Sequence, residues 1–396
     1  MQRIYLDYAA TTPMDDRVLE SMLPFLKEQF YNPSSLYSGA REVRMQVDKA
    51  REIVAEALGA LPGEIIFTSS GTESANLAII GSALANRDTL RHKILFGASE
   101  HHCVLETKPL LESLGFSVDL LPIERDSSVS LESCKQWIKN DVLLVCVMHA
   151  NNETGIIQPI ELIAGMCKNV GALFACDIVQ SFGTLPFSVK EIPVDFAWIS
   201  AHKFFGPKGI GVLYARGGTK PQPIIMGGGQ EREMRAGTEF VAGIIGLAES
   251  VKVHLQENSS QKVKELRDIF RAEIEEQFLL NHLPNLIWTV QSGPEDRRVW
   301  ENVLPGHAHF RVPGADAESV LINLDRYGVD ASSGSACSSG SIEPSHVLLA
   351  MGLSEKEAKE GLRFTIGKHN TREEMKKSAM FIMQSVKEVL QAKGQL

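Results

Sequence analysis

The sequence predicts an α/β fold in which a mostly parallel sheet is covered by helices. Short apolar runs of strand length alternate along the chain with amphipathic stretches of helical period, a pattern typical of parallel sheets. No internal repeat or low-complexity segment interrupts this alternation. The chain has 396 residues, which suggests two or three domains and a sizeable core.

Local patterns predict the elements of the first half of the chain. Val43 and Val54 fall on one face of a helix expected over residues 40–58, and Gly59 supplies its stop. A second helix should begin near Thr72. Apolar runs predict strands at residues 64–68, 94–96, 142–148, 172–176, 196–200 and 210–214.

The second half of the chain has a different pattern, because longer stretches of helical period replace the alternation of short strands and helices. Residues 240–278 are expected to be helical, with a break near 258–260. The last helix should start after Thr371, which forms a capping box with Glu374. Between these helices we expect a strand at 286–290, a helix at 318–326 and a loop of small residues at 332–341.

We place a domain boundary near residue 250. Residues 21–250 would form a large domain with a mixed, mostly parallel sheet, and residues 251–396 a smaller α+β domain. Residues 1–20 are expected to pack on the smaller domain, because an extended N-terminus needs an anchor.

The composition narrows the functional classes. A formal net charge of -9 argues against a general nucleic-acid binder, which normally has a basic face. The chain lacks an apolar run of the roughly 18 residues that cross a bilayer, and its N-terminus lacks the pattern of a secretory signal, so we expect a cytoplasmic protein. No disulfide framework is expected. Five of the cysteines are interpreted as small hydrophobic side chains: Cys103, Cys134, Cys146, Cys167 and Cys176.

Polar residues follow several predicted strands, where ligands bind in open α/β sheets. Residues 68–73 can hold a phosphate at the start of a helix, although such a segment is more often a simple helix cap. Asp177 follows another strand, with Gln180 three residues on. A carboxylate there can keep a pyridine nitrogen protonated; a helix cap is the alternative. His101 and His102 follow a further predicted strand; an imidazole there can stack on such a ring, or the two can be ordinary loop histidines.

Two lysines compete for the role of a Schiff-base amine, which has to lose its proton. Lys203 and Lys208 both lie in a turn between two predicted strands. A histidine and two phenylalanines adjoin Lys203, and desolvation favours the neutral amine. The local sequence therefore prefers Lys203, although a solvated surface lysine is the simpler alternative.

Cys337 differs from the other cysteines, because residues 332–341 contain no other large side chain. A thiol in such a loop suits a nucleophile that reaches one site and delivers to another; a connector with an incidental cysteine is the alternative. Arg363 lies in a strand-like, partly apolar run at 361–367. It needs a partner there, either a substrate carboxylate bound bidentately or a structural ion pair.

These segments, in this order, resemble the NifS/IscS-type cysteine desulfurases of the class V aminotransferase family, nearly end to end. The matching motifs lie at residues 5–13, 32–35, 70–73, 100–101, 149–153, 177–180, 200–203, 235–238, 333–337, 343–344 and 363–367. The resemblance implies fold type I of the pyridoxal-5'-phosphate (PLP) dependent transferases, with PLP as the cofactor. The cysteine loop and the downstream arginine are its most specific part.

The resemblance also implies residue roles. Around the ring it assigns the covalent link to Lys203, the pyridine nitrogen to Asp177, the ring hydroxyl to Gln180, stacking to His101 and the substrate side of the ring to Asn152. Around the phosphate it assigns Gly71, Thr72, Ser200 and His202, with Thr238 supplied by the second subunit of a homodimer. Arg363 would bind the substrate carboxylate. The catalytic residues would be Lys203, Cys337 and His101.

The activity implied is the conversion of L-cysteine to L-alanine, with the sulfur carried as a persulfide on Cys337. The sulfur would pass to a scaffold protein for iron–sulfur clusters or to partners in tRNA thiolation. We expect no metal site, although Cys337 could contact a transferred iron–sulfur cluster. A selenocysteine lyase, an ordinary PLP aminotransferase and a non-enzymatic sulfur-relay platform remain alternatives.

The sequence departs from the family pattern at three places. Tyr31 precedes the motif at 32–35 where glycine is usual, and Leu36 and Tyr37 replace a histidine-containing stretch. His307 and His309 stand where an asparagine is more common. None of these positions is the lysine, aspartate or cysteine of the predicted site, so they bear on loop shape and partner choice.

Overall fold

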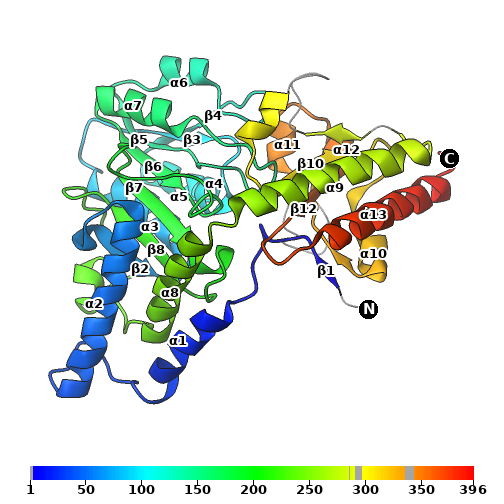
Figure 1. Ribbon diagram of the computed structural model, residues 1–396. Coiled ribbons are helices and arrows are strands. Elements are labelled where there is room, and N and C mark those ends of the chain that lie inside the picture. The colour runs from blue at the N-terminus through cyan, green and yellow to red at the C-terminus, as the bar shows by residue number, and fades with distance from the viewer. Residues whose placement is uncertain (1–2, 285, 290–296, 335–342) are drawn as a thin grey trace.

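A seven-stranded sheet forms the centre of one half of the molecule (Figure 1). The computed structural model describes residues 3–284, 286–289, 297–334 and 343–396. The strand order is β2-β8-β7-β6-β5-β3-β4; β8 is antiparallel to both neighbours and all other pairs are parallel. The strands are β2 (Ile65–Thr68), β3 (Lys93–Gly97), β4 (Ser117–Leu121), β5 (Val142–Cys146), β6 (Leu173–Asp177), β7 (Phe196–Ser200) and β8 (Gly211–Ala215).

Helices cover both faces of this sheet, as the alternating sequence pattern predicts. On one face the core contains side chains from α2 (Ser38–Leu58), α7 (Ile160–Val170) and α8 (Val241–Glu257). On the other face it contains side chains from α3 (Gly71–Ala85). The central strands β5 and β7 are buried along their whole length, as expected of strands covered on both sides. The predicted α/β fold is confirmed.

A second hydrophobic core lies around a three-stranded antiparallel sheet in the order β12-β10-β9. The strands are β9 (Ile287–Trp288), β10 (His307–Arg311) and β12 (Gly361–Thr365). The helices packed on it are α9 (Ser260–Leu280), α10 (Ala317–Tyr327) and α13 (Arg372–Ala392). Thr371 caps α13 and forms the predicted capping box with Glu374.

The N-terminal segment joins this second core. Strand β1 (Ile4–Tyr5) pairs in parallel with β11 (Val329–Asp330), and Ile4 and Leu6 are buried in the core. The chain then crosses to α1 (Asp16–Lys27) beside α8 on the first half (Figure 1). The two cores also meet at the joint between α8 and α9, where Asn258 has the left-handed conformation. The division near residue 250 remains a prediction. No helix among the described residues is both long and apolar enough to cross a membrane.

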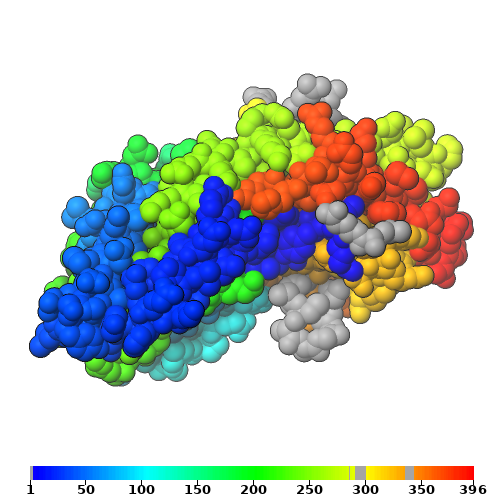
Figure 2. All heavy atoms as spheres, turned by 60° about the horizontal axis from the view of Figure 1, so that its bottom comes forward, coloured from blue at the N-terminus to red at the C-terminus, as the bar shows by residue number. Residues whose placement is uncertain are grey.

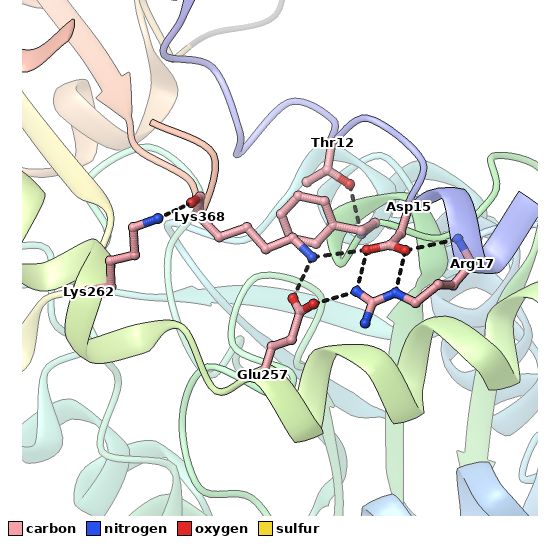
Figure 3. Close-up of polar contacts among 7 residues, drawn as sticks. Thr12, Asp15, Arg17, Glu257, Lys262 and Lys368 are labelled. Atoms are coloured by element: carbon pink, nitrogen blue, oxygen red, sulfur yellow. Dashed lines mark hydrogen bonds and ion pairs between the residues drawn. The ribbon is translucent and has the colours of Figure 1, made fainter. Parts of the chain in front are cut away.

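An ion-pair network fastens this joint (Figure 3). Lys368, after β12, donates to Asp15 at 3.2 Å and to Glu257 at 2.6 Å, and its ammonium lies 4.1 Å from the centroid of the Phe205 ring. Arg17 binds the same two carboxylates. The network therefore links the start of α1, the end of α8 and the second core. Hydrogen bonds from Arg17 and Lys368 hold the pKa of Asp15 well below its usual range, and the same cations lower the pKa of Glu257.

We expect the substitution Lys368→Met to lower the free energy of unfolding by about 1–3 kcal/mol, because hydrogen bonds between charged groups are lost. The loss should shrink as the pH falls below the ordinary carboxyl range. Carboxyls whose pKa is lowered by folding stabilise the protein above their unfolded pKa, and this contribution disappears as they are protonated. Urea unfolding at several pH values measures both effects.

The matched control is Lys376→Met, because Lys376 forms an exposed ion pair with Glu273. Surface pairs contribute about 0–1 kcal/mol, so this variant should stay close to the wild type. An equal effect of the two substitutions at every pH would contradict the importance of the network.

Candidate functional site

The predicted site residues gather around one cavity of about 490 Å³ at the carboxyl ends of the parallel strands. Most lie at the carboxyl ends of β2, β3, β5, β6 and β7 or in the segments that follow these strands, whereas Arg363 comes from β12 (Gly361–Thr365). The cavity is lined by Asp7, Ala9, Ala10, Ser70, Gly71, Thr72, His101, Cys103, Met148, Ala150, Asn152, Asp177, Val179, Gln180, Ser200, His202, Lys203, Ser332, Gly334 and Arg363.

Lys203 lies in a short 3-10 turn directly after β7. Its Nζ donates to the carbonyl oxygens of Ala9 at 2.6 Å and Ala10 at 2.8 Å, so the N-terminal segment forms one wall of its pocket. Burial, together with the nearby charge of Arg363, lowers the pKa of the Lys203 amine from 10.5 to about 8. Lys208, the other candidate lysine, is exposed and does not line the cavity.

Asp177 is the last residue of β6, not the residue after it as the sequence suggested. Its Oδ1 accepts a hydrogen bond of 2.8 Å from the N–H of Val179. Burial raises the pKa of Asp177 to about 6, partly offset by that hydrogen bond. Gln180 lies close by and donates through Nε2 to the carbonyl of Ala9 at 3.0 Å.

The residues predicted to hold a phosphate lie at the N-terminus of α3. Ser70 caps the helix, and its side chain accepts from the N–H of Glu73 at 3.1 Å. The helix itself leaves the N–H groups of Gly71 and Thr72 without an intrahelical partner, and both residues line the cavity. Such N–H groups, together with the helix dipole, favour an anion.

Ser200 and His202 border the same side of the cavity. Ser200 ends β7 and is buried. The Nδ1 of His202 lies 3.1 Å from the hydroxyl oxygen of Thr11. Burial lowers the pKa of His202 to about 4, with a further contribution from Lys203, so this imidazole is neutral at pH 7.

His101 faces the cavity from the segment that follows β3. Its Nδ1 accepts from the N–H of Cys103 at 3.1 Å and caps a short helix, which fixes the ring. Although the ring is open to the cavity, desolvation by the surrounding protein lowers the pKa of His101 to about 4, and Lys203 adds to this effect. A neutral, flat ring at this place suits the predicted stacking on a cofactor.

Arg363 is the middle residue of β12 and reaches the cavity from the second core. Its Nη2 donates to Asp7 at 2.8 Å, and its Nη1 donates to the carbonyl of Asn152 at 2.9 Å. Its buried Nε has no hydrogen-bond partner among the described residues. The structural ion pair that the sequence left open is therefore present, and one guanidinium donor is buried without a partner among the described residues.

Asp7 is the site residue that the sequence alone does not single out. It pairs with Arg363 across 356 positions of the chain. In the sequence, Asp7 is marked only by its position directly after the apolar Leu6, which is buried in the structure. This local pattern does not predict which residue Asp7 will pair with.

Two predicted residues are not brought into the described cavity. Thr238 is exposed and is not among the lining residues. Cys337 lies outside the described residues, but Ser332 and Gly334, which precede it closely in the sequence, line the cavity. The remaining predicted residues, Gly71, Thr72, His101, Asn152, Asp177, Gln180, Ser200, His202, Lys203 and Arg363, all line it.

Comparison with known proteins places this arrangement in a family. The family model described as aminotransferase class-V matches residues 4–377, and the chain belongs to that family. A curated relative, cysteine desulfurase IscS of Dictyoglomus turgidum, is 44% identical over 376 residues, which cover 94% of this chain and 92% of the relative.

Two solved structures share the whole fold. A NifS-like protein superposes with a TM-score of 0.87 at 34% identity, covering 99% of this chain and 100% of that one. SspA in complex with cysteine superposes with a TM-score of 0.78, also at 34% identity, covering 93% of this chain and 100% of that one.

Enzymes of the class-V family depend on PLP, and the residues of the cavity fit that cofactor. The buried carboxyl of Asp177, whose pKa is raised, forms no ion pair with the residues that the structure describes, and a protonated pyridine nitrogen would supply a cationic partner. The N-terminus of α3 offers donors for the phosphate. Lys203 has an amine that can be neutral and able to form a Schiff base.

We expect PLP to be incorporated into the cofactor-free protein faster as the pH rises. The neutral fraction of an amine with a pKa near 8 grows about tenfold per pH unit below that value and then levels off. Stopped-flow absorbance between pH 6 and pH 9.5 measures the rate. A rate that keeps rising by a constant factor up to pH 9.5 would show that Lys203 has an ordinary pKa.

Proposed function

We propose that this chain is a cysteine desulfurase, which converts L-cysteine to L-alanine and carries the sulfur as a persulfide on Cys337. The observation that best supports this proposal is that Lys203, Asp177, Arg363 and Gly334 all line the same cavity. Gly334 precedes Cys337 by three residues. The names of the relatives support the same activity, since one is a cysteine desulfurase and another was solved with cysteine.

The residues divide the work of binding and proton transfer. Arg363 binds the carboxylate of L-cysteine, since its side chain lines the cavity and its Nε–H has no partner among the described contacts. PLP, when bound, withdraws electrons from the Cα of the amino acid and so acidifies its proton. Lys203 carries that proton, since its lowered pKa suits a group that accepts and returns a proton near neutral pH.

The sulfur step belongs to Cys337. Its thiolate attacks the sulfur of the substrate, an S–S bond forms, and the Cβ–S bond breaks. The electron pair of the broken bond stays with the carbon, and a proton added there completes the methyl group of alanine. The enzyme keeps the sulfur as a persulfide, from which a partner takes it.

We further propose a homodimer that acts in the cytoplasm and delivers sulfur to an acceptor protein, for iron–sulfur cluster assembly or tRNA thiolation. Leu19, Leu23 and Leu26 are exposed on one face of α1, which lies on the surface shown in dark blue in Figure 2. Such an apolar stripe favours a protein partner. Thr238 is also exposed, as a residue supplied to a second subunit must be. Light scattering tests the dimer, and a monomeric mass at micromolar concentration would contradict it.

The decisive test of the activity compares wild type with Cys337→Ala in an alanine assay with L-cysteine and a reductant. We expect alanine from the wild type and a loss of about 100-fold or more in the variant, because the sulfur acceptor is gone. Both proteins should keep the absorbance of bound PLP.

The matched control is Cys103→Ala, which removes the thiol that the described cavity contains. Burial raises the pKa of the Cys103 thiol far above neutrality, so it is a poor nucleophile and its removal should leave alanine formation unchanged. Equal alanine formation by wild type and Cys337→Ala would indicate a lyase instead. A requirement for a 2-oxo acid would indicate an aminotransferase, and bound PLP without any alanine would favour the sulfur-relay platform.

A further inference from the structure

The segment 335–342, which carries Cys337, joins the described structure at two points. We call residues 332–334 the incoming foot and residues 343–345 the outgoing foot. The incoming foot is paired with β12: the N–H of Arg363 donates to the carbonyl of Ser332 at 2.7 Å, and the N–H of Ser332 donates to the carbonyl of Arg363 at 3.2 Å. The incoming foot is thus fixed directly to the strand that supplies the carboxylate-binding arginine.

The outgoing foot is fixed to other parts of the site. Ser345 caps α11 (His346–Ala350), and its hydroxyl accepts from the N–H of Leu348 at 3.2 Å. The next residue, His346, lies with Nε2 2.9 Å from the carbonyl of Glu100, directly before His101. The incoming foot is therefore fastened to a strand that lines the cavity, and the outgoing foot to a helix whose first residue contacts the residue before His101.

One side chain contacts both feet. The carboxylate of Glu153 is buried, and its Oε2 accepts from the hydroxyl of Ser345 at 2.5 Å. The same oxygen lies only 3.1 Å from the position that a Cβ on Gly334 would take. Gly334 has φ of +91°, which favours glycine, and it packs directly on the side chain of Glu153.

Glu153 itself is rigidly placed. Its N–H donates to the side-chain oxygen of Asn151 at 2.8 Å, within a buried turn after β5. The residue before it, Asn152, accepts from Arg363 through its carbonyl. One turn therefore carries both a contact to Arg363 and the contact to the two feet.

The length of the chain shows which foot matters for Cys337. A fully extended chain spans about 3.3–3.6 Å per residue. Cys337 lies three residues after Gly334, so their Cα atoms are separated by at most about 11 Å. It lies eight residues before Ser345, which would allow about 28 Å. The position of the incoming foot at the cavity wall therefore determines whether the thiol can reach the substrate.

We propose that Glu153 is a positioning residue for the sulfur transfer: it clamps Gly334 and Ser345 together and so holds Cys337 within reach of the cavity. This inference rests on the proposed desulfurase function and adds a residue to it. Glu153 does not contact the substrate in this account, since it is not among the residues that line the cavity.

The experiment compares two reactions of the PLP-loaded protein. Alanine formation from L-cysteine needs Cys337, whereas 3-chloro-L-alanine loses chloride without a thiol and ends, with water, as pyruvate and ammonium. We expect Glu153→Ala to lower kcat for alanine formation by about 10- to 100-fold, because a misplacement of roughly 1 Å costs that much. KM for L-cysteine and the rate of chloride release should change by less than about twofold.

A binding readout independent of turnover is the affinity for L-alanine, followed by the absorbance of bound PLP. It should be unchanged in Glu153→Ala, because Arg363 and Lys203 remain in place. Persulfide on Cys337, measured by mass spectrometry after a single turnover, should fall in parallel with alanine formation.

Three further variants make the design specific. Glu153→Gln keeps the length of the side chain and an oxygen that can accept from Ser345, so it should restore most of the rate. Gly334→Ala disturbs the same contact from the other side and should reproduce the selective loss, even if Glu153→Ala folds poorly. Asp195→Ala is the matched control. This partly buried carboxylate lies just before β7, at the amino ends of the strands and so away from the cavity, and it accepts from the N–H of Phe174 in β6.

Equal losses in both reactions, or a weaker affinity for L-alanine, would overturn the proposal, because Glu153 would then support the binding site as a whole. No loss in either Glu153→Ala or Gly334→Ala would overturn it as well. If the wild type releases chloride but forms no alanine, the proposed function fails and the inference with it. Equal losses in both reactions, or no loss in either variant, would be observed with a wild type that makes alanine. A failure of the Glu153 proposal can therefore be distinguished from a failure of the proposed function.

Discussion

The path of residues 4–15 is the constraint on which the site depends. This segment pairs with β11, forms a bridge between Asp7 and Thr365, and then crosses to the first core. On the way its carbonyl groups at Ala9 and Ala10 hold the amine of Lys203. The same segment contacts the arginine from the other core, because Asp7 accepts a hydrogen bond from Arg363.

The same segment also fixes the backbone beyond Lys203. Phe205 has φ of +64°, which is unfavourable for a bulky residue and needs support. Its N–H donates to the hydroxyl of Thr12 at 2.8 Å, and its carbonyl accepts from the N–H of Asp15 at 3.0 Å. Asp15 in turn takes part in the network around Lys368 shown in Figure 3. The N-terminal segment therefore fixes the backbone around Lys203 and joins the two cores through the same set of contacts.

How much of this follows from the sequence depends on the range of the interactions. Helices α2 and α13 follow from local periodicity and caps, and the strand β5 from an apolar run. Local chemistry also prefers Lys203 to Lys208, and the structure leaves Lys208 exposed. The contacts of Asp7 and Glu153 cannot be predicted in this way, because their partners Arg363 and Ser345 are distant in the sequence and are set by tertiary packing.

The buried charged groups of the cavity depend on one another, or on a bound partner, for compensation of their charge. Taking a carboxylate or an ammonium out of water is costly unless an opposite charge is near. Asp7 offsets Arg363, whereas burial raises the pKa of Asp177 and lowers that of Lys203. These two groups are poised to bind a partner that carries a protonated ring nitrogen and reacts with a neutral amine.

The proposed sulfur acceptor, Cys337, has a different requirement from the residues that would hold the cofactor. Those residues must stay within fractions of an ångström of one arrangement, so they are built on strand ends and helix starts, which are rigid. A thiol that first meets a substrate and then a partner protein must serve two places, and no strand residue can do this. The structure fixes the two feet to different elements, Ser332 to β12 and Ser345 to α11. The feet therefore set where the chain leaves and re-enters the described part of the site.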